Sequence, residues 1–224
     1  MAKPVQIIGS PLSPYVRKVL ACLRFKGIDW EIDPIVPFFG GDRLTRISPL
    51  RRIPVLVDDA VTLCDSSVIC QYLEDRYPSP SLYPTDVVAR ARARWYEEFA
   101  DSRLGEVFIW HFFYQLSIQQ AVWGEAADKA VIDHALSVDI PEVLNWLESE
   151  LTDDGYLCSD FSIADISIAA FFRSAAFVRF RTDPARWPRS RSILIVSSTP
   201  SRLLALNPWR TSCCERRSTS IATR

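Results

Sequence analysis

Apolar residues in the first 80 positions fall into short runs and one-sided helical patterns. Residues 5–9 form a β-branched, apolar run that predicts a buried strand, and residues 14–26 carry apolar side chains at helical spacing. Asp58 and Asp59 separate two further apolar runs and predict a hairpin. The predicted elements are strand 5–9, helix 14–26, strand 29–36, strand 53–59, strand 60–63 and helix 66–77. This order predicts a small α/β unit of about 80 residues.

Three prolines separate this unit from a region with a different pattern. Pro78, Pro80 and Pro84 lie within seven residues, and such a cluster predicts a linker. The expected domains are therefore residues 1–80, an α/β domain, and residues 86–224, an all-helical domain.

The second region is predicted to be helical because strand patterns fade and apolar residues recur every three or four positions. The predicted helices are residues 88–114, 126–151 and 162–173. Pro141 is expected to kink or split the second helix. Ser162 and Asp165 form a predicted capping box, with an apolar run behind them.

Residues 189–224 are atypical of the rest of the chain. They contain seven Arg, no Lys and one acidic residue, Glu215, and helical periodicity is weak after Leu206. Two explanations stay open: a shifted reading frame or altered terminus, and a divergent native tail. The coding DNA distinguishes them, since a shift predicts that another frame encodes an amphipathic helix.

Composition and charge narrow the class of protein. Of the 224 residues, 48% are hydrophobic and 24% charged, which allows a sizeable core, and the net charge of −1 gives no general attraction to nucleic acid or membrane. The six cysteines form no C-x-x-C pair, and His111 and His134 lack metal-ligand spacing to them, so no metal site is expected. No apolar run is long enough for a spanning helix or a signal peptide. A cytoplasmic protein with reduced thiols is predicted.

The first candidate functional residues are Ser10 and Ser13, which precede the first helix in the segment GSPLSPYVRKVL. Serine is a favoured N-cap and Pro14 suits the first helical position, so a purely structural role is one explanation. A hydrolase nucleophile is disfavoured, because it needs a neighbouring base and both histidines lie in the helical half. The turn resembles the active site of glutaredoxins and thioredoxins, with Ser13 in place of a cysteine. Serine cannot exchange disulfides, but beside a helix N-terminus it can donate a hydrogen bond to a bound thiolate.

Two further pairs lie at predicted strand ends. Pro54 follows a loop and precedes a strand, which is where a thioredoxin-like fold places its cis proline, although an Ile-Pro bond by itself is usually trans. A cis Ile53-Pro54 bond would let the backbone of Ile53 pair with an extended peptide ligand. Asp65 and Ser66 open the next helix, either as an N-cap or as a site for the amine and carboxylate of an α-amino acid group such as γ-glutamyl. Because strand ends of an α/β sheet gather ligand-binding loops, we expect these pairs and Ser13 to lie close together.

Four segments together resemble cytosolic glutathione S-transferases of the serine type, and of a bacterial kind: SPYVRKV, ISPLRRIPVL, DSSVICQYLEDRYP and FSIADI. The resemblance covers about residues 4–188. It implies a thioredoxin-like N-terminal domain, an all-α C-terminal domain, and a cytoplasmic homodimer that acts in detoxification.

The resemblance also implies roles for individual residues. Ser13 matches the catalytic serine, and Ser10 is the alternative. The family's Asn before the proline of its N-P-x-G segment is Ser48 here, and the glycine is missing from SPLRRIP. A glycine that often precedes the FSIAD segment is missing as well. These departures concern loop geometry rather than the fold.

The implied glutathione-binding residues are Arg52, Ile53, Pro54, Asp65 and Ser66. The backbone of Ile53 would meet the cysteinyl part of glutathione, and Asp65 with Ser66 would hold its γ-glutamyl end. Arg52 would meet the glycyl carboxylate, for which Arg51 is nearly as good a match.

A hydrogen bond and a helix N-terminus together supply enough free energy to ionise the thiol, so no general base is needed. A free thiol has a pKa of about 8.5, and lowering it by two units requires roughly 2.7 kcal/mol. A hydrogen bond to a charged group contributes about 1.5–3 kcal/mol and a helix N-terminus about 0.3–1 kcal/mol. The predicted function is transfer of glutathione to a small hydrophobic electrophile. The alternatives are a non-catalytic glutathione-binding or regulatory protein of the same fold, and a glutathione-dependent isomerase or dehalogenase.

Overall fold

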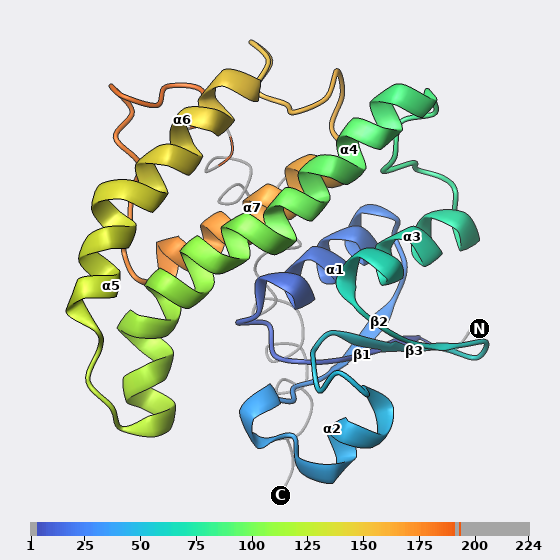
Figure 1. Cartoon of the computed structure of the whole chain (residues 1–224). Coiled ribbons are helices and arrows are strands. Elements are labelled where there is room, and N and C mark those ends of the chain that lie inside the picture. Colours follow the sequence, from blue (N-terminus) through green and yellow to red (C-terminus); the bar gives the residue numbers. More distant parts are fainter. Residues whose placement is uncertain (1–3, 191–192, 194–224) are drawn as a thin grey trace, which may run out of the picture.

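A four-stranded mixed sheet forms the centre of the N-terminal region in the computed structural model, which describes residues 4–190 and 193 (Figure 1). The strands are β1 Val5–Ile8, β2 Trp30–Asp33, β3 Val55–Val57 and β4 Thr62–Cys64, in the order β2-β1-β3-β4. β1 runs parallel to β2, and β3 is antiparallel to both β1 and β4. Figure 1 shows α1 (Pro14–Phe25) and α3 (Ser66–Arg76) on one side of the sheet and α2 (Gly41–Ile47) on the other.

Helix α1 begins where its capping residues predict. Ser13 is the N-cap and Pro14 the first helical residue, while Arg24 in the last turn complements the helix dipole. The apolar side chains of Val19 and Leu23 are fully buried. The helix packs against both α3 and α7 (Ile163–Phe177), so it joins the sheet to the helical region.

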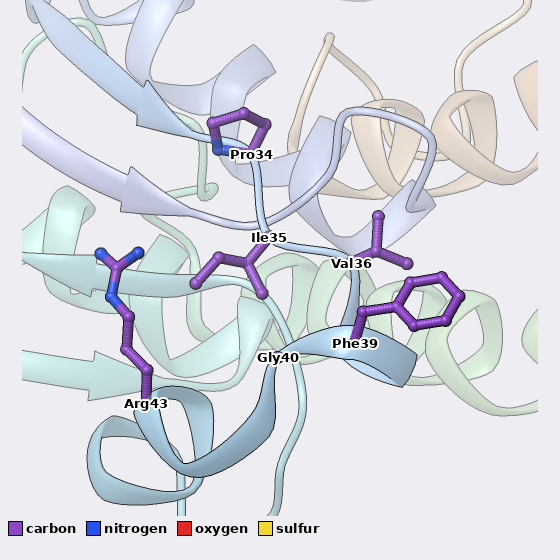
Figure 2. Close-up of a pocket in the computed structure, with 6 residues that line it drawn as sticks. All are labelled: Pro34, Ile35, Val36, Phe39, Gly40 and Arg43. Atoms are coloured by element: carbon purple, nitrogen blue, oxygen red, sulfur yellow. The ribbon is translucent and has the colours of Figure 1, made fainter.

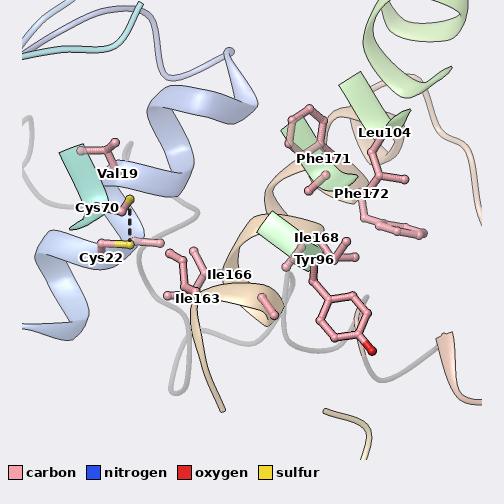
Figure 3. Packing of buried hydrophobic residues seen from close by; sticks show 14 of the residues in the cluster. Val19, Cys22, Cys70, Tyr96, Leu104, Ile163, Ile166, Ile168, Phe171 and Phe172 are labelled. Atoms are coloured by element: carbon pink, nitrogen blue, oxygen red, sulfur yellow. Dashed lines mark hydrogen bonds between the residues drawn. The ribbon is translucent and has the colours of Figure 1, made fainter. Parts of the chain in front are cut away.

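The rest of the described chain is built from helices and their connecting loops. α4 (Val87–Phe99) continues into η2 (Ala100–Trp123), which has π-type turns; then follow α5 (Lys129–His134), η3 (Ala135–Asp139), α6 (Ile140–Glu150) and α7. α7 contacts α1, α4 and η2, and most of its side chains are buried, as expected of a central helix. Figure 3 shows Ile163, Ile166 and Phe172 of α7 within this core.

The predicted fold class, a thioredoxin-like α/β unit followed by an all-helical region, is confirmed. Helix α2 and the 3-10 turn Pro37–Phe39 were not predicted, because Leu44 is the single buried side chain of α2 and leaves no periodic signal. The long helix extends to Trp123, beyond the predicted residue 114, and Gly124 ends it with φ 70°.

The predicted capping box at the start of α7 is confirmed. The Ser162 hydroxyl accepts a hydrogen bond from the Ala164 N–H, and the Asp165 carboxylate accepts one from the Ser162 N–H at 2.9 Å. The same carboxylate also accepts a hydrogen bond from the Leu157 N–H at 3.1 Å. Burial nevertheless raises the pKa of Asp165 from 3.8 to about 6.

This raised pKa predicts a pH dependence of stability. Between about pH 4 and 6 native Asp165 holds a proton that the unfolded chain has lost, so the contribution is present at pH 4 and declines as the pH rises. The wild-type free energy of unfolding should fall by about 2–3 kcal/mol more over this range than that of Asp165→Asn. Urea titrations at several pH values measure the two slopes. Parallel curves for the two proteins would show that Asp165 does not titrate in this window.

The atypical segment is described only at Arg189, Ser190 and Ile193. Glu148 of α6 accepts hydrogen bonds from the Arg189 N–H at 2.7 Å and from the Ser190 N–H and hydroxyl at 2.9 Å each. The chain is therefore anchored to α6 as far as residue 190. The predictions made for the rest of the segment lie outside the described residues.

Candidate functional site

The strand register places four chain segments at one edge of the sheet. Ile8 at the end of β1 lies opposite Asp33 at the end of β2 and opposite Val55 at the start of β3. Val55 in turn lies opposite Cys64 at the end of β4. The loop before α1, the segment after β2, the Ile53-Pro54 bond and the start of α3 therefore share this edge, as expected for a ligand site of an α/β sheet.

Ser13 caps α1 and keeps its own proton available. Its hydroxyl oxygen accepts a hydrogen bond from the Val16 N–H at 3.4 Å. The Ser10 oxygen likewise accepts one from the Leu12 N–H at 3.3 Å. Within the described residues neither hydroxyl is recorded as a donor, and both side chains are half-buried. A cap therefore does not exclude chemistry, because capping uses a lone pair and leaves the O–H free to donate.

Tyr15, two residues farther along, is the other hydroxyl near the start of α1. It donates a hydrogen bond to the backbone carbonyl of Asp101 at 3.0 Å and packs edge-to-face on Phe171. Burial, followed by the Asp101 carboxylate, raises the pKa of Tyr15 to about 12. Its one proton is engaged within the protein, so Tyr15 is a poorer thiolate donor than Ser13.

The loop before β3 presents a free backbone. The Ile53-Pro54 bond is cis, as in a thioredoxin-like fold, and Ile53 is buried. In the described part of the chain, neither the N–H nor the C=O of Ile53 takes part in a hydrogen bond, which leaves both available to an extended ligand. The side chain of Arg52 is exposed, and its positive charge lowers the pKa of Tyr15, against the larger effect of burial.

Two departures from the family pattern have structural consequences in this loop. Ser48 is fully buried; its hydroxyl donates to the Arg52 carbonyl at 2.9 Å and accepts from the Arg52 N–H at 3.1 Å. Ser48 thus holds the loop closed. Arg51 adopts φ 52°, a left-handed conformation that favours glycine.

Asp65 and Ser66 adjoin the same edge at the start of α3. One Asp65 carboxylate oxygen, Oδ1, accepts from the N–H groups of Ser67 at 2.9 Å and Val68 at 3.2 Å. No hydrogen bond to its other oxygen is found in the described ranges, and the residue is exposed. Asp65 has φ 85°, a strained conformation that is often found at ligand sites. Ser66 is buried as the first residue of the helix.

A buried ionic cluster lies behind Ser66. The Lys18 ammonium, fully buried, is 2.6 Å from Asp101 Oδ2 and 3.2 Å from Glu97 Oε1, and it donates a hydrogen bond to Ser67 Oγ at 2.9 Å. Asp101 Oδ2 also accepts from Ser67 Oγ at 2.8 Å and from Ser66 Oγ at 3.5 Å. The cluster therefore connects α1, α3 and the α4–η2 helix, and it fixes the start of α3.

A pocket of about 360 Å³ lies in the segment after β2 (Figure 2). Its lining residues are Pro34, Ile35, Val36, Phe39, Gly40 and Arg43. Arg43 pairs with Asp33, the last residue of β2. The pocket adjoins the ligand edge of the sheet, with apolar side chains and one cation.

Other candidate groups do not form a second site. The aromatic run at residues 107–115 contributes mainly to the core, as Phe108 packs on Phe172 with ring centroids 5.0 Å apart. His111 pairs with Asp139 at 3.2 Å, away from the sheet edge on η2. Across residues 4–190 and 193, no group of His, Cys, Asp or Glu side chains is suited to a metal ion.

Ser10, Ser13 and the Ile53-Pro54 and Asp65-Ser66 pairs adjoin one edge of the sheet, as expected from the sequence. The buried charged residues that hold this edge in place were not predicted. Lys18 and its neighbour Arg17 were visible in the SPYVRKV segment, yet nothing in the sequence showed that both are fully buried. Asp101 lies on a helix whose spacing gives no sign of a polar role.

Comparisons with known proteins agree on one family. The family profile described as "Glutathione S-transferase, N-terminal domain" matches residues 7–81. An uncharacterized GST-like protein of Escherichia coli (strain K12), YibF, is 33% identical over 192 residues, which covers 85% of this chain and 90% of the relative.

Solved structures show the same fold. A glutathione S-transferase from Rhodospirillum rubrum F11 matches with a TM-score of 0.83 at 22% identity, over 95% of this chain and 94% of that one. A glutathione S-transferase from Methylobacterium radiotolerans, solved in complex with glutathione sulfonate, matches with a TM-score of 0.72 at 25% identity, over 91% and 95% of the two chains.

Proposed function

This chain belongs to the glutathione S-transferase family, and on that premise we propose that Ser13 holds the glutathione thiolate for attack on a small hydrophobic electrophile. One observation carries the proposal: the Ser13 hydroxyl lies at the N-terminus of α1, on the ligand edge, with its proton uncommitted. Ser10, three residues earlier, is the alternative donor.

We propose that glutathione lies along the ligand edge in an extended conformation. The free N–H and C=O of Ile53, before cis Pro54, would pair with the cysteinyl residue. The uncommitted Asp65 oxygen would bind the γ-glutamyl ammonium, and the backbone N–H of Ser66 at the start of α3 would bind its carboxylate. Arg52 would meet the glycyl carboxylate.

The reaction then needs no general base from the protein. The thiol releases its proton to solvent, and the Ser13 O–H and the positive end of α1 stabilise the anion that remains. The sulfur lone pair forms a C–S bond with the electrophile. A leaving group such as halide departs with the electrons of the broken bond, or a proton from solvent adds to the carbanion after conjugate addition.

Further properties belong to the same proposal. The domain division at residues 1–80 and 86–224 assigns the glutathione-binding loops to the first domain. Cytoplasmic location, a homodimer and a role in detoxification follow from the family. None of the helices in the described ranges has the length and apolar character needed to cross a bilayer.

Retention on immobilised glutathione, followed by assays with a panel of electrophiles, tests the proposal. We expect retention, elution by free glutathione, and turnover with at least one aryl halide or conjugated carbonyl compound. Retention without turnover on any substrate would support the non-catalytic alternative. Turnover confined to glutathione-dependent isomerisation or dehalogenation would support the third possibility.

A further inference from the structure

The guanidinium of Arg17 joins the serine loop to helix α7. Nη1 donates hydrogen bonds to the carbonyls of Pro11 at 3.0 Å and Leu12 at 2.6 Å. Nη2 donates to the carbonyl of Ala170 at 2.7 Å and to the hydroxyl of Ser174. These four hydrogen bonds are called the Arg17 bridge below.

Arg17 is buried in an unusual way for a cation. It is fully buried and forms no salt bridge with a carboxylate in the described part of the chain. Burial, followed by the charge of Arg173, lowers the pKa of Arg17 to about 9. A buried charge without a counter-ion is costly. Here Nη1 and Nη2 donate to neutral oxygens and the guanidinium lies 5.4 Å from the centroid of the Phe177 ring, while Nε has no hydrogen-bond partner among the described residues.

The bridge acts on the backbone between the two candidate hydroxyls. Within the loop, the Ser13 N–H donates to the Ser10 carbonyl at 2.9 Å and the Leu12 N–H donates to Ser10 Oγ. The side chain of Leu12 is 49% exposed and gives the loop little packing support. The carbonyls of Pro11 and Leu12 are therefore held in place mainly by Arg17.

We propose that Arg17 is a positioning residue that fixes the direction of the Ser10 and Ser13 hydroxyls by binding their loop to α7. This inference rests on the proposed function, because it assigns Arg17 a role in orienting the thiolate donor. Hydrogen-bond strength falls steeply with misalignment, and displacements of about 1 Å can reduce rates by about 100-fold. A loosened loop should therefore raise the pKa of the bound thiol without weakening the more distant glutathione contacts.

Ser174→Ala is the mildest test, because Ser174 reaches the loop through Arg17. The matched control is Ser167→Ala, since Ser167 is also fully buried on α7 and its hydroxyl has no hydrogen-bond partner among the described residues. We expect Ser174→Ala to lower kcat/KM at pH 6.5 by about threefold to tenfold and to raise the apparent thiol pKa by about half a unit. Ser167→Ala should leave both within about twofold and 0.1 unit.

Arg17→Lys is the stronger variant, because it keeps the charge and removes the two-ended geometry. We expect kcat/KM to fall by about 10- to 100-fold and the thiol pKa to rise by about one unit, while the Kd of S-methylglutathione changes less than threefold. Circular dichroism and urea titration give the folded fraction, against which activity is normalised. An unchanged thiol pKa in both Arg17→Lys and Ser174→Ala would overturn the proposal, whatever the loss of stability.

Ser13→Ala and Ser10→Ala in the same titration separate the two proposals. If a serine variant raises the thiol pKa and the Arg17 and Ser174 variants do not, the positioning role proposed for Arg17 is wrong and the serine mechanism stands. If the Arg17 and Ser174 variants raise it and neither serine variant does, the serine assignment is wrong, and with it the proposal that Arg17 acts by orienting these hydroxyls.

Discussion

Ser13→Ala is expected to lower kcat/KM at pH 6.5 by about 10- to 100-fold and to shift the pH–rate profile by one to two units toward alkaline pH. The lost hydrogen bond to a charged group is worth about 1.5–3 kcal/mol, and each 1.36 kcal/mol is a factor of ten. At pH above the thiol pKa of the variant, activity should recover much of the difference, because most of the bound thiol is then ionised without help.

Two companion variants make this prediction specific. Ser13→Thr keeps both the cap and the hydroxyl, and should retain most of the activity. Ser10→Ala should leave the profile in place if Ser13 is the donor. The cap loss of about 1 kcal/mol in Ser13→Ala is measured separately by urea unfolding, so that stability and activity are not confused. A full effect in Ser10→Ala with none in Ser13→Ala would transfer the role to Ser10.

Lys18→Met is expected to reduce the free energy of unfolding by about 3–5 kcal/mol, the largest stability effect of any single substitution considered. Burial disfavours the Lys18 charge, but Asp101 and Glu97 outweigh it and the pKa of Lys18 is raised. Burial raises the pKa of Glu97 in spite of Lys18. Without the ammonium, two carboxylates remain in a buried site, and one must take up a proton or draw in water.

An exposed pair supplies the control for Lys18. Arg92 and Glu150 are 3.3 Å apart with the Arg92 side chain 64% exposed, so Arg92→Met should change stability by less than about 1 kcal/mol. Adding Glu97→Gln to Lys18→Met should restore part of the loss, since it removes one uncompensated charge. A loss below about 1 kcal/mol in Lys18→Met would show that the cluster is not stabilised by its cation.

The order of helices and strands was predictable from local sequence patterns, but the buried contacts that hold the site in place were not. Ser13-Pro14 and Ser162 with Asp165 marked helix starts because capping is a local interaction between neighbouring residues. The contacts of Lys18 with Asp101, and of Arg17 with Ala170, span 83 and 153 residues. Such pairs depend on how helices pack, and a single sequence contains no local signal for them.

The absence of a family glycine indicated altered backbone geometry in the loop before β3. The missing glycine corresponds to Arg51, which takes the left-handed conformation itself, and Ser48 stands in place of the expected Asn and forms two hydrogen bonds with the Arg52 backbone. The loop keeps its cis Ile53-Pro54 bond despite both changes. Which residues can replace a glycine depends on the surrounding contacts, and these are visible only in the structure.

The most direct test of the serine mechanism is the titration of glutathione bound to the wild-type protein, followed by the ultraviolet absorbance of its thiolate. A hydroxyl donor and a helix N-terminus acting together predict a midpoint near pH 6.5, about two units below that of a free thiol. A midpoint at about 8.5, unchanged from the free thiol, would contradict the claim that this protein stabilises the thiolate at all.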